Sequence, residues 1–87
     1  MPYQVEFSKQ AEKQFKDLPQ QIQNRLQLRI DALVENPRPT GVKKLEGAEN
    51  QYRIRLGDYR LVYQIQDAIL LIILVRIGHR SEVYRRR

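Results

Sequence analysis

The stretch "QYRIRLGDYRLVYQI", residues 51–65, decides the fold of this chain. Large apolar side chains alternate with polar ones on both sides of Gly57 and Asp58, two residue types that favour tight turns. The alternation predicts two half-buried strands, residues 51–56 and 59–66, that pair as an antiparallel hairpin with Gly57 and Asp58 as its loop.

The two faces of this hairpin differ in charge. One face carries Tyr52, Ile54, Leu56, Tyr59, Leu61 and Tyr63, and the other carries Arg53, Arg55, Arg60, Val62 and Gln64. A one-residue slip would bury the arginines, so the pattern favours this register. Arg55 then lies opposite Arg60, and at roughly 5 Å in water the two charges repel by about 1 kcal/mol. Such crowding indicates a phosphate-binding face; the alternative is that these arginines pair with Glu46, Glu49 or Asp58.

Residues before the hairpin predict one strand and two helices. Residues 3–7 alternate as a strand, and Ser8 is a good N-cap for a helix that ends before Pro19. Pro19 suits the first turn of a second helix, whose apolar stripe is Ile22, Leu26, Ile30 and Leu33. The run "NPRP" ends that helix, and the short link between the two helices predicts an antiparallel helical hairpin.

The predicted fold class is α+β in a single domain, residues 1–87. An N-terminal strand and the helical hairpin precede a three-stranded antiparallel meander. Residues 40–50 are expected to form a polar loop. The third strand of the meander is predicted at residues 68–76, after a tight turn at Gln66 and Asp67, and the chain is expected to turn again at Gly78.

Composition excludes several classes of site. The 87 residues contain no cysteine and one histidine, so disulfides and thiol catalysis are excluded, and neither a metal site nor a cofactor is expected. The N-terminus lacks the apolar segment of a secretory signal, and the longest apolar run, residues 68–75, is too short to span a bilayer. A cytoplasmic protein without a membrane partner is expected.

The positive charge is concentrated in the second part of the chain. Residues 1–50 hold eight Lys+Arg and seven Asp+Glu, whereas residues 51–87 hold eight arginines and three acidic residues. Arginine presents a planar fork that matches phosphate oxygens. This distribution favours a nucleic-acid partner, and a solubilising surface is the alternative.

A second cluster of candidate functional residues lies in "RIGHRSEVY", residues 76–84, which brings together His79, Arg80 and Tyr84. Cleavage of RNA by its own 2′-hydroxyl requires cations at the phosphate, a group that moves a proton and a group that holds the nucleotide. Arginine, histidine and tyrosine supply these three roles. Taken singly, His79 and Tyr84 could equally be structural.

These residues together resemble the RelE family of toxins from type II toxin–antitoxin modules, within the RelE/ParE superfamily. The resemblance rests on "YQVEFSKQAEKQFKDLP", "ENPRP", "KKLEG", "YRIRLGDYRLVYQI" and "IGHRSEVY", of which the last two are the most specific. It implies a small sheet flanked by a helical hairpin. It also implies a ribosome-dependent endoribonuclease, an mRNA interferase that cuts in the A site without a metal ion and leaves a 2′,3′-cyclic phosphate and a 5′-hydroxyl.

The resemblance also implies roles for individual residues. Arg60 and Arg80 would stabilise the phosphate, and Tyr84 would stack on a nucleotide. Well-studied members carry lysines at the positions of Arg53 and Arg55, and an arginine does not give up its proton as a lysine can. These two arginines are therefore expected to bind substrate, together with Lys43 and Lys44 of "KKLEG". His79 is the candidate general base, with Glu46 as the second candidate.

The implied partners are a cognate antitoxin, the 70S ribosome and mRNA, with operator DNA bound only through the antitoxin complex. Two alternatives stay open. One is the ParE type, which shares the fold but inhibits DNA gyrase and is not a nuclease. The other is a non-catalytic RNA- or ribosome-binding module.

Overall fold

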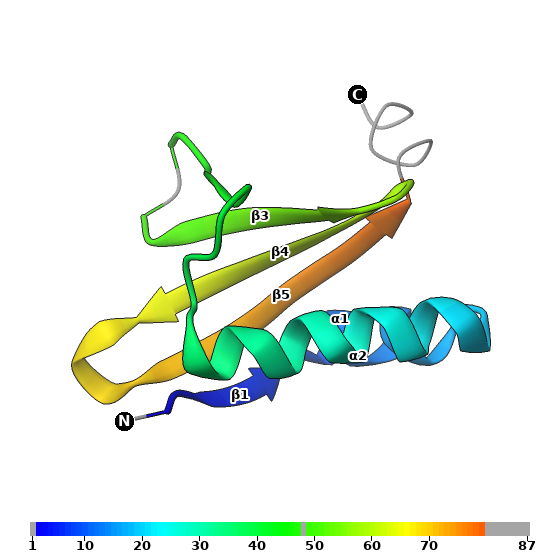
Figure 1. Cartoon of the computed structure of the whole chain (residues 1–87), viewed down its shortest axis with the longest axis horizontal. Helices are drawn as coiled ribbons and strands as arrows, with labels where there is room; N and C mark the ends of the chain where they lie inside the picture. The colour runs from blue at the N-terminus through cyan, green and yellow to red at the C-terminus, as the bar shows by residue number, and fades with distance from the viewer. Residues whose placement is uncertain (1, 48, 80–87) are drawn as a thin grey trace.

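The structure, a computed structural model, describes residues 2–47 and 49–79. Its elements are β1 (Gln4–Phe7), α1 (Lys9–Lys16), α2 (Gln20–Glu35), β2 (Lys43–Lys44), β3 (Gln51–Leu56), β4 (Tyr59–Gln66), the 3-10 helix η1 (Asp67–Ile69) and β5 (Leu71–His79). The predicted α+β fold is confirmed, with the helical hairpin between the first strand and the meander (Figure 1). Within these residues, no helix is long and apolar enough to cross a membrane.

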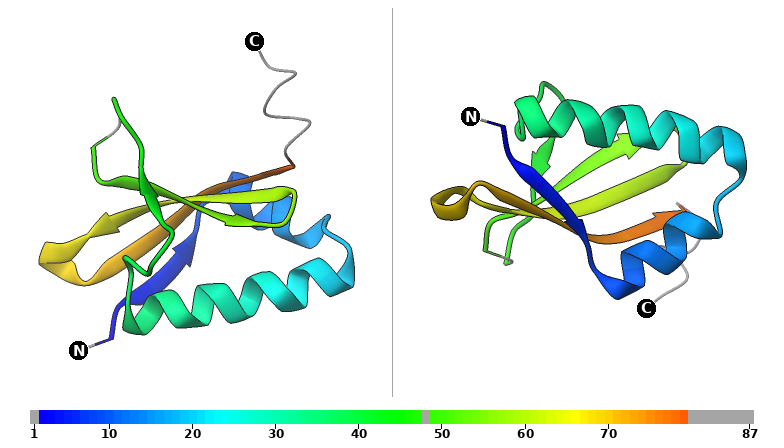
Figure 2. Two further views of the ribbon diagram at one scale, coloured as in Figure 1. Left: turned by 45° about the horizontal axis from the view of Figure 1, so that its top comes forward. Right: turned by 90° about the horizontal axis from the view of Figure 1, so that it is seen from below.

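The five strands form one sheet in the order β1-β5-β4-β3-β2. β1 runs parallel to β5, and every other pair of neighbours is antiparallel. Both helices lie on the same side of the sheet (Figure 2). One face of the meander is therefore covered by helices, and within residues 2–47 and 49–79 no helix lies on the opposite face.

The β3–β4 hairpin has the predicted register. Leu56 pairs with Tyr59, Arg55 with Arg60, and the pairing continues outwards to Gln51 with Gln64. Gly57 has a φ of 59°, a left-handed value that the first loop position of a type II′ turn requires and that glycine adopts without strain.

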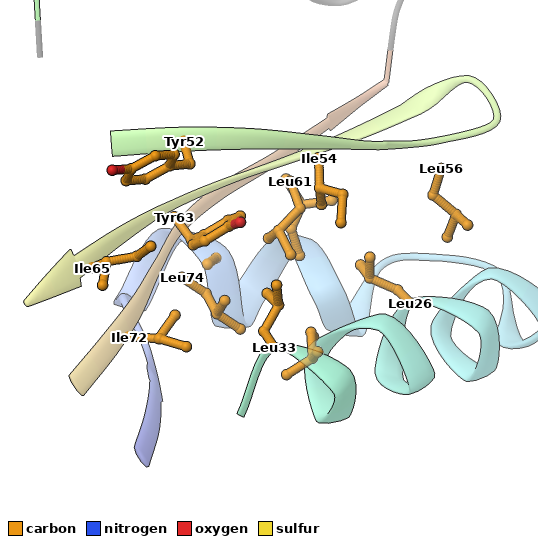
Figure 3. Packing of buried hydrophobic residues seen from close by; sticks show 13 residues of the cluster. Leu26, Leu33, Tyr52, Ile54, Leu56, Leu61, Tyr63, Ile65, Ile72 and Leu74 are labelled. Carbon is orange, nitrogen blue, oxygen red and sulfur yellow. The ribbon is translucent and has the colours of Figure 1, made fainter. Parts of the chain in front are cut away.

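The hydrophobic core lies between the helices and the apolar face of the hairpin (Figure 3). From α2, the buried residues are Leu26, Ile30 and Leu33, three of the four residues of the predicted stripe; from the sheet they include Ile54, Leu61, Tyr63, Ile65, Ile72 and Leu74. The ring of Tyr63 is fully buried, and its hydroxyl donates a hydrogen bond of 2.7 Å to the carbonyl of Pro37. The link after α2 is thereby fixed against β4.

Four local predictions were wrong. The turn at Gln66 and Asp67 is wider than a two-residue hairpin loop, because η1 follows Gln66 and Leu70 then adopts a left-handed φ of 54°. β5 therefore begins at Leu71 rather than at residue 68, and it continues through Gly78, where a turn was predicted. The expected loop at residues 40–50 contains the short strand β2, which pairs with the start of β3.

A polar cluster holds the end of the meander beside η1. The carboxylate of Asp67 accepts hydrogen bonds from the hydroxyl of Tyr3 at 2.6 Å and from the guanidinium of Arg38 at 2.8 and 3.4 Å. Arg38 also donates to the hydroxyl of Tyr52 at 3.1 Å. These contacts join the start of the chain, the link after α2, β3 and η1, which explains why residues 67–70 do not form a tight hairpin loop.

Replacing Leu26 by alanine is expected to lower the free energy of unfolding by about 2–5 kcal/mol, because it leaves a cavity between α2 and the sheet. Leu26 is 1% exposed, whereas Leu28 on the same helix is 70% exposed. Leu28→Ala is the matched control and should change the stability by less than about 0.5 kcal/mol. Urea denaturation of both variants measures the difference. Equal effects would show that α2 buries another face.

The charge of Asp67 is expected to contribute stability that disappears in acid. Hydrogen bonds from Arg38 and then from Tyr3 hold the pKa of Asp67 below its ordinary value. A carboxylate with a lowered folded-state pKa stabilises the fold above its unfolded-state pKa of about 4, and this contribution is lost as the pH falls through the folded-state pKa. Wild type should therefore melt at a higher temperature than Asp67→Asn at neutral pH. The difference in melting temperature should disappear once the pH is below the folded-state pKa of Asp67. A gap that persists in strong acid would contradict the assignment.

Candidate nucleic-acid interface

Among the residues that the structure describes, five cationic ones share the sheet face that is turned away from the helices. Side chains alternate along a strand, so the neighbours of the buried Tyr52, Ile54 and Leu56 point to the opposite face. The cationic residues of this face are Lys43 on β2, Arg53 and Arg55 on β3, Arg60 on β4 and Arg76 on β5. We call this set the cation face.

One cross-strand row of the cation face contains two arginines and a glycine. Arg55 on β3 is the register partner of Arg60 on β4, and Arg60 is in turn the partner of Gly78 on β5. Because glycine has no side chain, no side chain projects from the sheet at the position beside Arg60. An anion could enter there and meet guanidinium groups from two strands.

The neighbouring row contains three cationic residues. Lys43 pairs with Arg53, Arg53 with Val62, and Val62 with Arg76. The register between β4 and β5 shifts between Val62 and Tyr63, whose partners are Arg76 and Leu74. Without this bulge, Arg76 would share the face of the fully buried Leu74; with it, Arg76 joins the cation face.

Val62 forms the apolar floor between these arginines. It is 4% exposed although it lies on the face without helices. A small pocket there is lined by Leu45, Arg53, Arg60, Val62, Arg76 and Gly78. Aliphatic stems of arginine can cover an apolar surface while their charged ends stay in water, so the three arginines are held around a common point.

Pairing with acidic residues does not account for the two arginines of β3. Neither Arg53 nor Arg55 forms an ion pair with any carboxylate of the residues that the structure describes. Within the described parts of β2 to β5, the cation face carries no carboxylate and no imidazole. The face therefore keeps a concentrated positive charge that suits an anion.

His79 lies on the opposite side of the sheet from these arginines. It pairs with Tyr59, and the two rings meet edge to face with their centroids 5.0 Å apart. Both line a pocket with Gln14 and Leu18 from the helical side. The structure thus places His79 at the end of β5, next to Gly78 in the chain, without joining it to the cation face.

The other predicted site residues do not lie together. Lys43 joins Arg53 and Arg55 around one pocket, whereas Lys44 is the partner of Tyr52 and points to the other side of the sheet. Glu46, the second candidate base, lines a separate pocket beside Lys44. Arg80 and Tyr84 lie outside the described residues, among which no cluster of acidic, histidine or cysteine side chains is placed to hold a metal ion.

α1 fixes the end of β5 that carries Arg76 and Gly78. β1 stops at Phe7, whose partner is Leu74, so no strand of the described part of the chain pairs with the rest of β5 on that side. There the hydroxyl of Ser8 donates to the carbonyl of Val75 at 2.7 Å, and Oε1 of Gln14 accepts from the backbone N–H of Ile77 at 2.6 Å. Ser8 is also the predicted N-cap, because its Oγ accepts from the N–H of Ala11.

Sequence reasoning missed Arg76. Its residue type was visible, but strict alternation from Ile72 and Leu74 would place it on the buried face. The available signal was the break in the apolar pattern at "VRIGH". Alternation from Ile72 and Leu74 would bury position 76 and expose position 77, but the sequence has an arginine at 76 and an isoleucine at 77. A bulge resolves that conflict.

Comparison with known proteins finds a match along nearly the whole chain. Residues 5–84 match a family model described as the ParE toxin of the type II toxin–antitoxin system parDE. The mRNA interferase toxin RelE of Escherichia coli is 33% identical over 88 residues, which cover 97% of this chain and 92% of that protein. Toxin RelG of Mycobacterium tuberculosis is 30% identical over 87 residues, covering 99% of this chain and all of that one.

Solved structures agree with the sequence matches. The RelE–RelB complex from Pyrococcus horikoshii contains a chain that superposes with a TM-score of 0.82 at 34% identity, covering 93% of this chain and 98% of that chain. For the intact RelBE toxin–antitoxin complex of Escherichia coli, the TM-score is 0.80 at 29% identity, with 88% and 95% covered.

Removing one of the opposed arginines is expected to stabilise the isolated protein at low salt. Arg55→Gln relieves its repulsion with Arg60, and the gain in melting temperature should be larger at about 0.05 M than at about 1 M salt, where charges are screened. Arg29→Gln, an exposed change of equal charge on α2, is the control. A loss of stability that is confined to Arg55→Gln would show that Arg55 has a structural partner.

Proposed function

This chain belongs to the RelE/ParE family of toxins from type II toxin–antitoxin systems and is of the RelE type, and from that premise we propose that it cuts mRNA in the ribosomal A site. The observation that carries the proposal is the row in which Arg55 and Arg60 face each other beside Gly78. Two guanidinium groups next to a position without a side chain form a cradle for one phosphate group.

The proposed reaction is an internal transfer at phosphorus. The 2′-oxygen of the RNA forms a bond to the adjacent phosphorus while the bond to the 5′-oxygen breaks, which gives a 2′,3′-cyclic phosphate and a 5′-hydroxyl. One proton leaves the 2′-hydroxyl and one reaches the departing oxygen. Negative charge grows on the phosphate oxygens between these events, and Arg60 with Arg55 would stabilise it; no metal ion is needed for this scheme.

Proton transfer and positioning are assigned as proposals to the remaining candidates. Arg80 would add a further positive charge at the phosphate, and Tyr84 would stack on a nucleotide to hold it splayed. His79 stays the first proposed base because an imidazole can move a proton near neutral pH. Its ring lies beside Tyr59 on the other side of the sheet from Arg60, so this role requires the end of β5 to turn over when RNA binds. Glu46 is the second candidate.

The proposed partners follow from the relatives and from the charge. RelE chains have been solved in complex with RelB antitoxins, and we expect a cognate antitoxin to cover the cation face of this chain as well. The toxin would act in the cytoplasm, where it would meet ribosomes that carry mRNA. Operator DNA would be bound only through the antitoxin complex.

The matched family model is described by the name of ParE, so gyrase inhibition is the second candidate function. The Escherichia coli relative that is 33% identical carries the name RelE instead. The concentration of arginine on one rigid sheet face also favours RNA phosphate as the target. A ribosome assay and a gyrase assay separate the two functions.

Cleavage on programmed ribosomes tests the proposed function. Purified protein is added to ribosomes stalled on a defined mRNA, and the cut sites are mapped by primer extension. Cuts should appear at the A-site codon, and free mRNA should stay intact. Arg60→Ala should lower the single-turnover rate by about a hundredfold or more, as expected for loss of a group that stabilises transition-state charge.

Arg29→Ala, on the helical side, is the matched control and should cut at the wild-type rate. Intact mRNA with the protein still bound would support a non-cleaving ribosome-binding module. Stabilised gyrase–DNA cleavage complexes without any mRNA cuts would support the ParE type. A fully active and well-folded Arg60→Ala protein would show that the row of Arg55, Arg60 and Gly78 does not bind the phosphate that is cut.

A further inference from the structure

Arg76 lies in the cation face only because of the bulge between β4 and β5. The bulge pairs Val62 with Arg76, so that Ile77 is buried while the arginine stays exposed. Arg76 forms no ion pair with a carboxylate of residues 2–47 or 49–79. Neither the fold nor a charge partner in the described chain therefore explains an arginine at this point.

Val62 lies between Arg76 and Arg53 on the sheet. These two arginines lie on either side of Val62 in the same cross-strand row, so their backbones are two strand spacings apart, or about 9.6 Å. Long side chains can converge across this gap over the buried valine, where the pocket contains both residues. The geometry is that of a clamp with an apolar floor.

This row lies one pleat away from the row of Arg55, Arg60 and Gly78. Two residues along a strand correspond to about 6.6 Å, which is comparable with the separation of successive phosphates in an RNA strand. We propose that Arg76 and Arg53, with Lys43 at the end of the row, bind the phosphate adjacent to the one that is cut. The identification of the ligand as RNA rests on the proposed function.

The arrangement favours RNA over an acidic protein segment. Two parallel rows of arginine at the repeat of a nucleotide backbone match a chain with one charge per unit, and the planar guanidinium fork bonds two oxygens of one phosphate. Acidic side chains on a peptide have no such fixed repeat. Arg76 would thus be a substrate-binding residue that sets which nucleotide enters the row of Arg60.

A direct test uses the intact toxin and a tetranucleotide whose 2′-oxygens are methylated, so that it binds without being cut. Arg76→Gln should weaken binding about tenfold, in line with loss of one charged hydrogen bond. It should also reduce the slope of log affinity against log salt by about 0.7, the value for one phosphate contact on a single strand. Arg29→Gln, with the same change of charge on α2, should alter neither quantity.

Neutral linkages locate the contact. A methylphosphonate at the linkage next to the central one should weaken binding of Arg76→Gln less than binding of the wild type, because the contact of Arg76 is already lost while those of Arg53 and Lys43 remain. Additive losses would overturn the proposal, as would Arg76→Gln binding like Arg29→Gln, or no binding of the tetranucleotide by the wild type. Equal dependence on Arg76 for a glutamate peptide of the same charge would overturn the assignment to phosphate.

The outcome is separable from that of the proposed function. A protein that fails to cut mRNA on ribosomes but shows the expected dependence on Arg76 retains the phosphate site and loses the nuclease assignment. A protein that cuts at the A-site codon, with Arg76→Gln unchanged in tetranucleotide affinity and in salt slope, retains the nuclease assignment and loses the site.

Discussion

The pairing register of β3 and β4 is the constraint on which the rest of the structure depends. It sends Ile54, Leu61 and Tyr63 towards α2 and every arginine of the hairpin to the other face. A slip by one residue would exchange the two sets and bury several cations, at a cost far above the stability of a small domain. The hydrophobic effect that forms the core therefore also assembles the cation face, and no separate interaction has to gather the charges.

The crowding of charges is sustained by the rigidity of the surrounding sheet. Arg55 and Arg60 repel each other across the hairpin, yet the repulsion between exposed charges is modest beside the burial of the hairpin's apolar face. Val62 gives the arginine stems an apolar surface to cover, and α1 secures β5 through Ser8 and Gln14. The backbone positions that carry the charges are thus fixed before a ligand arrives, which lowers the ordering cost of binding.

The hairpin, the helices and the arginines that the hairpin contributes to the cation face could be predicted from sequence because their signals are local. Alternation around Gly57 specified the register, and the spacing of Leu26, Ile30 and Leu33 specified the buried side of α2. The start of β5 could not be predicted, because "AILLIILV" is apolar throughout and its first residues are held in η1 by contacts of Asp67 with Tyr3 and Arg38. Arg76 and His79 required the structure as well: a bulge moves Arg76 onto the cation face, and alternation after Gly78 places His79 beside Tyr59.

The central claim is that mRNA lies along the cation face. Photo-crosslinking tests it most directly: a single 4-thiouridine is placed in the A-site codon of an mRNA on stalled ribosomes, the toxin is bound, and the cross-linked peptides are identified by mass spectrometry. The account predicts crosslinks to peptides from β3, β4 and the end of β5. Crosslinks confined to α1 or α2 would place the RNA on the helical side and contradict the account.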